Sequence, residues 1–213
     1  MPSTARQFFR DNLLPDVSQL IQTHRDVNPD GRGRRALGHL TRSGVVMLCA
    51  AWELYIEEVL VEGAKFLVQD AESPHFLPDP VKGRISQTAK SDTHAFGALK
   101  LCGDGWKTVY TDAVLNDVSI FNTPKIGKIN ELYKKWLGLN DISVNWRHPS
   151  ASLNAFVEAR GAIAHRGANA DYVRITRLAE LKTMIDELVV DTDRELSDYL
   201  YGISHNHRRP WRR

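Results

Sequence analysis

The sequence FVEARGAIAHRG, residues 156–167, predicts a helix that carries a cation on its apolar face. The residues that share this face, at intervals of four, three and four, are Leu153, Val157, Arg160 and Ala164. Gly167 follows at the position where a glycine commonly ends a helix. Such a face is directed at a core or at a partner, so we expect the rest of the chain to form a helical frame around this segment.

Arg160 is the unusual member of this face, because arginine is almost never fully buried without a partner. It either pairs with a carboxylate inside the protein, for which Glu53 and Glu57 are candidates, or lies at a cleft that receives an anion. His165 follows in the same helix. The residues alone leave both alternatives open.

The composition is that of a globular protein of moderate size. Its 213 residues are 42% hydrophobic, which suffices for one domain over residues 1–213. We expect a cytoplasmic protein without a membrane partner, since no apolar run reaches the length of a membrane span and residues 1–7 lack a signal-peptide core. Cys49 and Cys102 lack metal-ligand spacing and are expected to be reduced.

The formal charge of +2 says little about partners, but the arginines are clustered. One cluster contains Arg32, Arg34, Arg35 and Arg42, and the other contains Arg208, Arg209, Arg212 and Arg213. Such clusters either meet phosphates or are solvated faces and chain ends. We expect the second cluster to belong to a flexible basic tail, residues 203–213.

Apolar periodicity predicts an all-α bundle. The expected core helices cover residues 4–23, 34–69, 150–167 and 176–202. Pro15 is expected to kink or divide the first helix, and Ser43-Gly44 is a possible kink in the second. Residues 172–175 look briefly strand-like. In the last helix, a set of acidic residues is expected to face water: Asp186, Glu187, Asp191, Asp193 and Asp198.

Residues 71–148 are expected to form a helical insertion between the second core helix and the helix that carries Arg160. Prolines at 74, 78 and 80 argue against regular structure at its start, and a short helix is expected at residues 86–93. Another helix should follow Gly105. A third should be capped by Thr123, with Pro124 in its first position, and should end at Gly138.

The common catalytic motifs are absent. The chain has no His-Glu-x-x-His, no calcium loop, no phosphate-binding Gly-rich loop and no Gly-x-Ser-x-Gly. Its other seven histidines are scattered. Arg160 and His165 remain; five residues correspond to a rotation of roughly 140° on a helix, so they do not stack but can border one cleft.

This pair suits metal-free cleavage of a phosphodiester in RNA. A histidine titrates near neutrality, so it can take a proton from a ribose 2′-hydroxyl or give one to the leaving 5′-oxygen. An arginine can hold the phosphate and stabilise its growing charge. The alternative is structural: Arg160 pairs with a glutamate, and His165 interacts with the helix C-terminus.

Residues 160–165 match the Arg-x4-6-His motif of the HEPN superfamily. Residues 51–58 are similar to the matching helix of larger HEPN proteins from bacterial conflict systems. The stretch from Leu101 to Pro124 resembles the insertion of that branch, which includes RiboL-PSP-type HEPN domains. The resemblance spans most of the chain.

The resemblance implies an up-and-down helical bundle in which a homodimer brings two motifs into one cleft. It implies a metal-independent endoribonuclease, without a cofactor, that leaves 2′,3′-cyclic phosphate ends and acts as a toxin or antiviral effector. Arg160 would then bind the scissile phosphate, His165 would be the acid/base residue, and Arg166 is a further candidate for RNA binding. A cognate antitoxin or defence-system protein is an implied partner.

Two positions depart from the family pattern. The residue after the motif arginine is usually Asn, Asp or His, whereas here it is Gly161, which lacks the hydrogen bond that those residues supply. Some toxin members carry a tyrosine two residues after the histidine, where this chain has Gly167. Gly161 favours the alternative of a non-catalytic HEPN-like module that binds RNA or a protein.

Overall fold

The computed structural model describes residues 1–29 and 37–212. Four arginines of the two basic clusters lie outside the described residues: Arg32, Arg34, Arg35 and Arg213. Among the residues that the structure describes, regular structure is entirely helical, as the all-α prediction requires.

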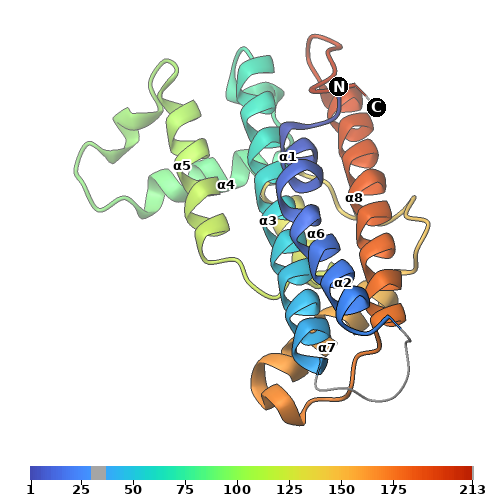
Figure 1. The fold of residues 1–213 in the computed structure, drawn as a ribbon. Helices are drawn as coiled ribbons and strands as arrows, with labels where there is room; N and C mark the ends of the chain where they lie inside the picture. The colour runs from blue at the N-terminus through green and yellow to red at the C-terminus, as the bar shows by residue number, and fades with distance from the viewer. Residues whose placement is uncertain (30–36, 213) are drawn as a thin grey trace.

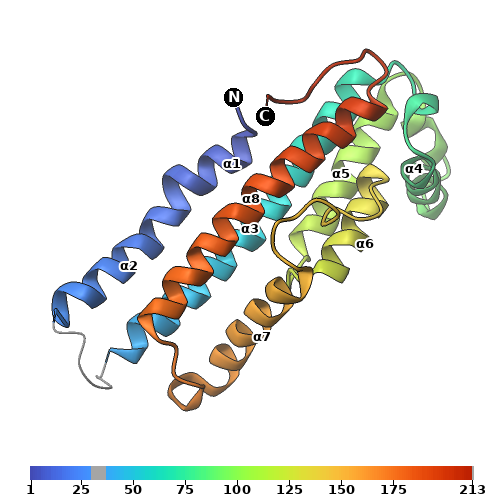
Figure 2. The same cartoon turned by 90° about the vertical axis from the view of Figure 1, so that its right-hand side faces the viewer.

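One long helix, α3 (Gly38–Asp70), forms the axis of the bundle (Figures 1 and 2). The core helices packed against it are α1 (Thr4–Phe8), α2 (Leu14–Val27), α7 (Ser150–Arg166) and α8 (Ile175–Ile203). Its aromatic residues are buried as expected for core positions. Tyr55 Oη donates to the Val189 carbonyl at 3.1 Å, and Trp52 Nε1 donates to the Pro124 carbonyl at 3.3 Å. These bonds fix α3 against α8 and against the segment that precedes α6.

The first helical segment is divided at the expected place. Residues 9–13 form a π-helical turn between α1 and α2, and Pro15 lies in the first turn of α2. Proline has no N–H and its ring crowds the preceding turn, so a widened turn is one way to accommodate it. The prediction that Pro15 interrupts this helix is confirmed.

Gly44 has a different role from the one expected. Helix α3 continues through Ser43 and Gly44 without interruption. A Cβ on Gly44 would lie 2.5 Å from Leu178 Cδ2 of α8. Glycine is therefore needed for the close approach of two helices, rather than for a kink.

The insertion contains three α-helices, α4 (Asp79–Ser91), α5 (Gly105–Ser119) and α6 (Ile126–Leu137). Helices α5 and α6 pack against α3, and α4 packs against both of them (Figure 2). The prediction for α4 was wrong at its start, because Pro80 occupies the first turn, where a missing N–H is tolerated. Thr123 does not cap α6: it has a φ of 59°, and the helix begins at Ile126. Gly138 ends α6 with a φ of 80°, as expected.

The expectations for the last helix need two corrections. No strand forms at residues 172–175, and α8 begins at Ile175. Two of its acidic side chains are buried rather than in water, because each has polar partners elsewhere in the chain. Arg147 pairs with Asp191, while Ser3 and Arg6 contact Asp193.

The basic tail is anchored, in contrast to the expected flexible segment. Trp211 is buried, and its Nε1 donates to the Asp193 carbonyl at 3.1 Å. The Arg212 N–H donates to the Met1 carbonyl at 2.9 Å, which brings the two ends of the chain together (Figure 1). Across the described residues, no helix combines the length and the apolar character needed to span a membrane.

Candidate functional site

Helix α7 lies along the first half of α3 and runs in the opposite direction, so that α7 ends beside the start of α3 (Figure 2). It begins at Ser150, as predicted, and Gly167 ends it with a φ of 54°. Its buried face consists of Leu153, Phe156, Val157 and Ile163. Ala164, expected on that face, is exposed, because Ile163 takes the position one turn after Arg160.

Arg160 is half-buried in the seam between α7 and α3. Its Nε–H is shielded from solvent and has no hydrogen-bond partner among the described residues. Its charge acts on two residues of α3, Cys49 and Glu53. Burial raises the pKa of the Cys49 thiol to about 11 and raises the pKa of Glu53, and Arg160 opposes both shifts.

The internal ion pair considered for Arg160 is not present within the described part of the chain. Neither Glu53 nor Glu57 comes within the 4.0 Å of a salt bridge. Glu53 is close enough to stabilise the guanidinium electrostatically without occupying its donors. A buried N–H without a partner is costly, so this arrangement leaves Arg160 able to gain from binding an anion.

Glu57 lies one turn further along α3. Its pKa is raised to about 7, first by burial and then by the neighbouring carboxylates of Glu53 and Glu58. A carboxyl group with this pKa is partly protonated at neutral pH. The negative charge on this side of α3 is therefore reduced near neutrality.

His165 and Arg166 are exposed near the end of α7. Neither forms a hydrogen bond or ion pair with another described residue, and no such bond joins Arg160 to His165. The five-residue separation places their side chains roughly 140° apart around the helix. One chain thus brings Arg160 into the seam while its His165 points toward solvent.

Gly161 has open space around it. A Cβ built at this position meets no atom within 4 Å. The chain therefore has room for the polar side chain that usually follows the motif arginine. The described His, Cys, Asp and Glu residues form no group of three that could hold a metal ion.

Two of the hollows on the described surface lie beside α3, and periodicity did not predict either. One, of about 500 Å³, opens between the start of α3 and the end of α7 and is lined by residues such as Arg42, Met47 and Ile163. One pattern in the sequence could have indicated this hollow. Arg42 and Val46 lie on the side of α3 that also holds Cys49 and Glu53.

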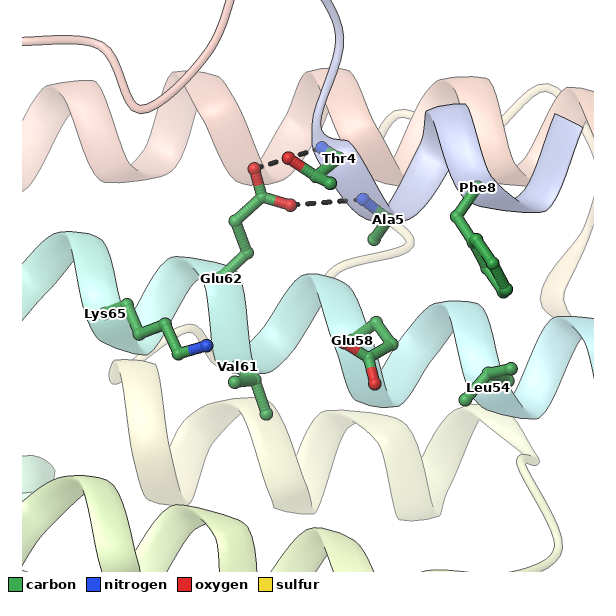
Figure 3. A pocket seen from close by; sticks show the side chains of 8 residues that line it. All are labelled: Thr4, Ala5, Phe8, Leu54, Glu58, Val61, Glu62 and Lys65. Carbon is green, nitrogen blue, oxygen red and sulfur yellow. Dashed lines mark hydrogen bonds between the residues drawn. The ribbon is translucent and has the colours of Figure 1, made fainter. Parts of the chain in front are cut away.

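The other hollow, of about 590 Å³, lies between α1 and α3 (Figure 3), and neither Arg160 nor His165 lines it. Phe8, Leu54 and Val61 give it an apolar surface. Glu62 accepts hydrogen bonds from the Thr4 and Ala5 N–H groups at 3.1 and 3.2 Å, so its carboxylate caps α1.

Residues 11–198 match the sequence model of the RiboL-PSP-HEPN family. The chain belongs to the RiboL-PSP-HEPN family. The match includes α7 with Arg160 and His165, the insertion, and most of α8. No curated protein and no solved structure matches the chain. The helical bundle agrees with an all-α HEPN fold, and membership of this family indicates a nuclease-like or RNA-related function.

Proposed function

We propose that this HEPN protein is a metal-independent endoribonuclease in which Arg160 binds the scissile phosphate and His165 transfers protons. The observation that supports the proposal most strongly is the buried Nε–H of Arg160, which has no hydrogen-bond partner among the described residues. A phosphate oxygen is a strong acceptor for such a donor. Family membership and the position of His165 five residues later are consistent with this chemistry.

The proposed reaction needs no group beyond the RNA and the two side chains. The ribose 2′-oxygen forms a bond to phosphorus, and the bond from phosphorus to the 5′-oxygen of the next nucleotide breaks. His165 takes the proton of the 2′-hydroxyl and, as the imidazolium so formed, supplies a proton to the leaving 5′-oxygen. Arginine stabilises the charge that develops on the phosphate oxygens. The products are a 2′,3′-cyclic phosphate and a free 5′-hydroxyl.

A homodimer would solve the geometric problem that a single chain has. Because Arg160 and His165 point in different directions around α7, one phosphate is more easily reached by Arg160 of one protomer and the histidine of its partner. Gly161 has no side chain and Ala162 only a methyl group, so a second backbone or an RNA strand can approach the helix closely here.

The biological setting that fits this activity is a toxin or an antiviral effector acting on cytoplasmic RNA. Such an enzyme needs a partner that restrains it, for which a cognate antitoxin or defence-system protein is the proposed class. Arg166, exposed beside His165, is proposed to contact the RNA backbone.

RNA cleavage in the presence of EDTA tests the proposal. The purified protein should cut single-stranded RNA and leave cyclic phosphate ends, which mass spectrometry identifies. His165→Ala should slow cleavage by about a hundredfold or more. His75→Ala, which removes an exposed histidine outside α7, is the matched control. Equal rates for His165→Ala and the parent protein would refute the assigned role.

A second candidate is a non-catalytic module that binds RNA. The observation that favours it is that no described residue orients His165, whereas a general base is commonly held by a second group. Under this alternative the protein binds RNA without cutting it, and the affinity falls steeply as salt rises.

A further inference from the structure

The hollow between α3 and α7 continues the seam that contains Arg160. Ile163, three residues after Arg160, and Gly167, seven residues after it, both line the hollow. Seven residues of helix correspond to about 10 Å along the axis. The hollow is thus close enough to Arg160 to receive a nucleotide that neighbours a phosphate bound there.

The floor of the hollow is apolar and adaptable. It combines Val46 and Met47 of α3 with Ile163 of α7. The Met47 side chain is 39% exposed, and methionine adapts its shape to flat or irregular surfaces. A floor of this kind offers contact area to the face of a nucleobase without selecting one base by hydrogen bonds.

The Arg42 guanidinium and the exposed Tyr172 ring both lie beside Gly38, in the first turn of α3. The position that a Cβ on Gly38 would take lies 3.0 Å from Arg42 Nη1 and 3.7 Å from Tyr172 ring carbons. Arg42 also lines the hollow, and Tyr172 lies near Arg42 without itself lining the hollow. The tyrosine is 40% exposed, and Arg42 forms no ion pair with any other described residue.

The charge of the hollow between α3 and α7 distinguishes it from the hollow between α1 and α3. Its lining includes Arg42 and no carboxylate. The hollow between α1 and α3, drawn in Figure 3, is instead lined by Glu58 and Glu62 together with Lys65. RNA is repelled by carboxylates and attracted by an arginine, so charge complementarity favours RNA in the first hollow.

We propose that this hollow is a nucleotide subsite of the RNA site, in which Tyr172 and Met47 contact a base and Arg42 binds its phosphate. The base stacks on an aromatic ring and an aliphatic floor, as in sequence-tolerant binding of single strands. The subsite rests on the proposed function in one respect: the nucleotide it holds is adjacent to the phosphate at Arg160.

Fluorescence anisotropy with a labelled single-stranded RNA of mixed sequence tests the subsite, in the full-length protein with His165→Ala to suppress cleavage. Tyr172→Ala should weaken binding by about tenfold, while Tyr172→Phe, which keeps the ring, should bind as the parent does. Arg42→Gln should reduce the slope of log affinity against log salt by about one. Tyr201→Ala is the matched control, because Tyr201 is 41% exposed near the far end of α8.

The outcomes separate the subsite from the proposed enzyme activity. Unchanged binding by Tyr172→Ala and Arg42→Gln refutes the subsite, even if the parent protein cuts RNA. Weakened binding by both variants supports it, even if the parent never cuts. Light scattering on Met47→Glu provides a second test: a change from dimer to monomer would mean that a second copy of the chain covers the hollow, which would overturn the assignment to RNA.

Discussion

Two arginines of this chain meet the core in opposite ways. Arg147 donates from Nε to both carboxylate oxygens of Asp191, at 3.0 and 3.1 Å, and from Nη2 to the Glu187 carbonyl at 3.2 Å. Arg160 has no ion pair among the described residues and keeps a buried Nε–H without a partner. Removing the partner of a buried, paired charge destabilises a fold, whereas a charge left unpaired at a surface seam is available to a ligand.

The largest expected difference between the two arginines is in activity. Arg160→Ala should reduce RNA cleavage by about a hundredfold or more, because it removes the group that stabilises charge on the phosphate. Arg160→Lys should remain strongly impaired, since lysine lacks the planar fork of arginine. Cleavage rates with saturating RNA measure both effects. Full activity in Arg160→Ala would contradict the role assigned to the unpaired arginine.

The comparison should reverse when stability is measured. Arg147→Ala leaves the buried Asp191 carboxylate without its main partner and should lower the free energy of unfolding by about 1–3 kcal/mol. Arg160→Ala should change it by less than about 1 kcal/mol. Urea unfolding followed by circular dichroism measures both variants. A larger loss for Arg160→Ala than for Arg147→Ala would mean that Arg160 has a structural role after all.

Restoring the usual polar residue after Arg160 sharpens the comparison. Gly161→Asn introduces a side chain into open space, so it should fold normally. One added hydrogen bond near the phosphate should raise the cleavage rate by about three- to tenfold. Gly161→Ala is the control, because it adds helix propensity without a hydrogen-bonding group. Equal rates for the two variants would show that a polar group at this position does not assist the reaction.

Glu57 gives the smallest effect on stability, and the size of this effect depends on pH. Its pKa of about 7 lies above the value of an unfolded chain, so the folded state binds more protons between these values. The free energy of unfolding therefore falls as the pH rises toward 7 and Glu57 ionises. Above the pKa of the folded state, this loss of stability no longer changes with pH. Glu57→Gln should be more stable than the parent at pH 8 by about 1 kcal/mol, a figure reduced for solvent screening, and equally stable at pH 4.

Urea titrations at both pH values measure this difference. Glu131→Gln, at an exposed position of α6, is the control. Its free energy of unfolding should differ from that of the parent by the same amount at pH 4 and at pH 8. A stability gain in Glu57→Gln that is already complete at pH 4 would exclude ionisation of Glu57 as its cause.

Local sequence predicted much of the helical framework, because helix start and stop signals act over a few residues. The interruption at Pro15 and the end of α6 at Gly138 are examples. Prediction from local sequence failed at Pro80, because proline can begin a helix as well as interrupt one. Pro80 lies in the first turn of α4, where the sequence was expected to prevent a helix. The prediction also failed for Thr123, whose left-handed backbone delays α6 until Ile126.

The sequence by itself determined that a cation interrupts an apolar helical face, with a histidine five residues later on the same helix, and that the family is HEPN. Only the tertiary structure decided which buried charges are paired. Asp193 is buried because Ser3, 190 residues earlier in the chain, reaches it, and Arg160 is unpaired because the approach of α7 to α3 leaves Glu53 out of bonding range. Periodicity reports only the face of a helix, whereas pairing depends on which distant side chain lies opposite.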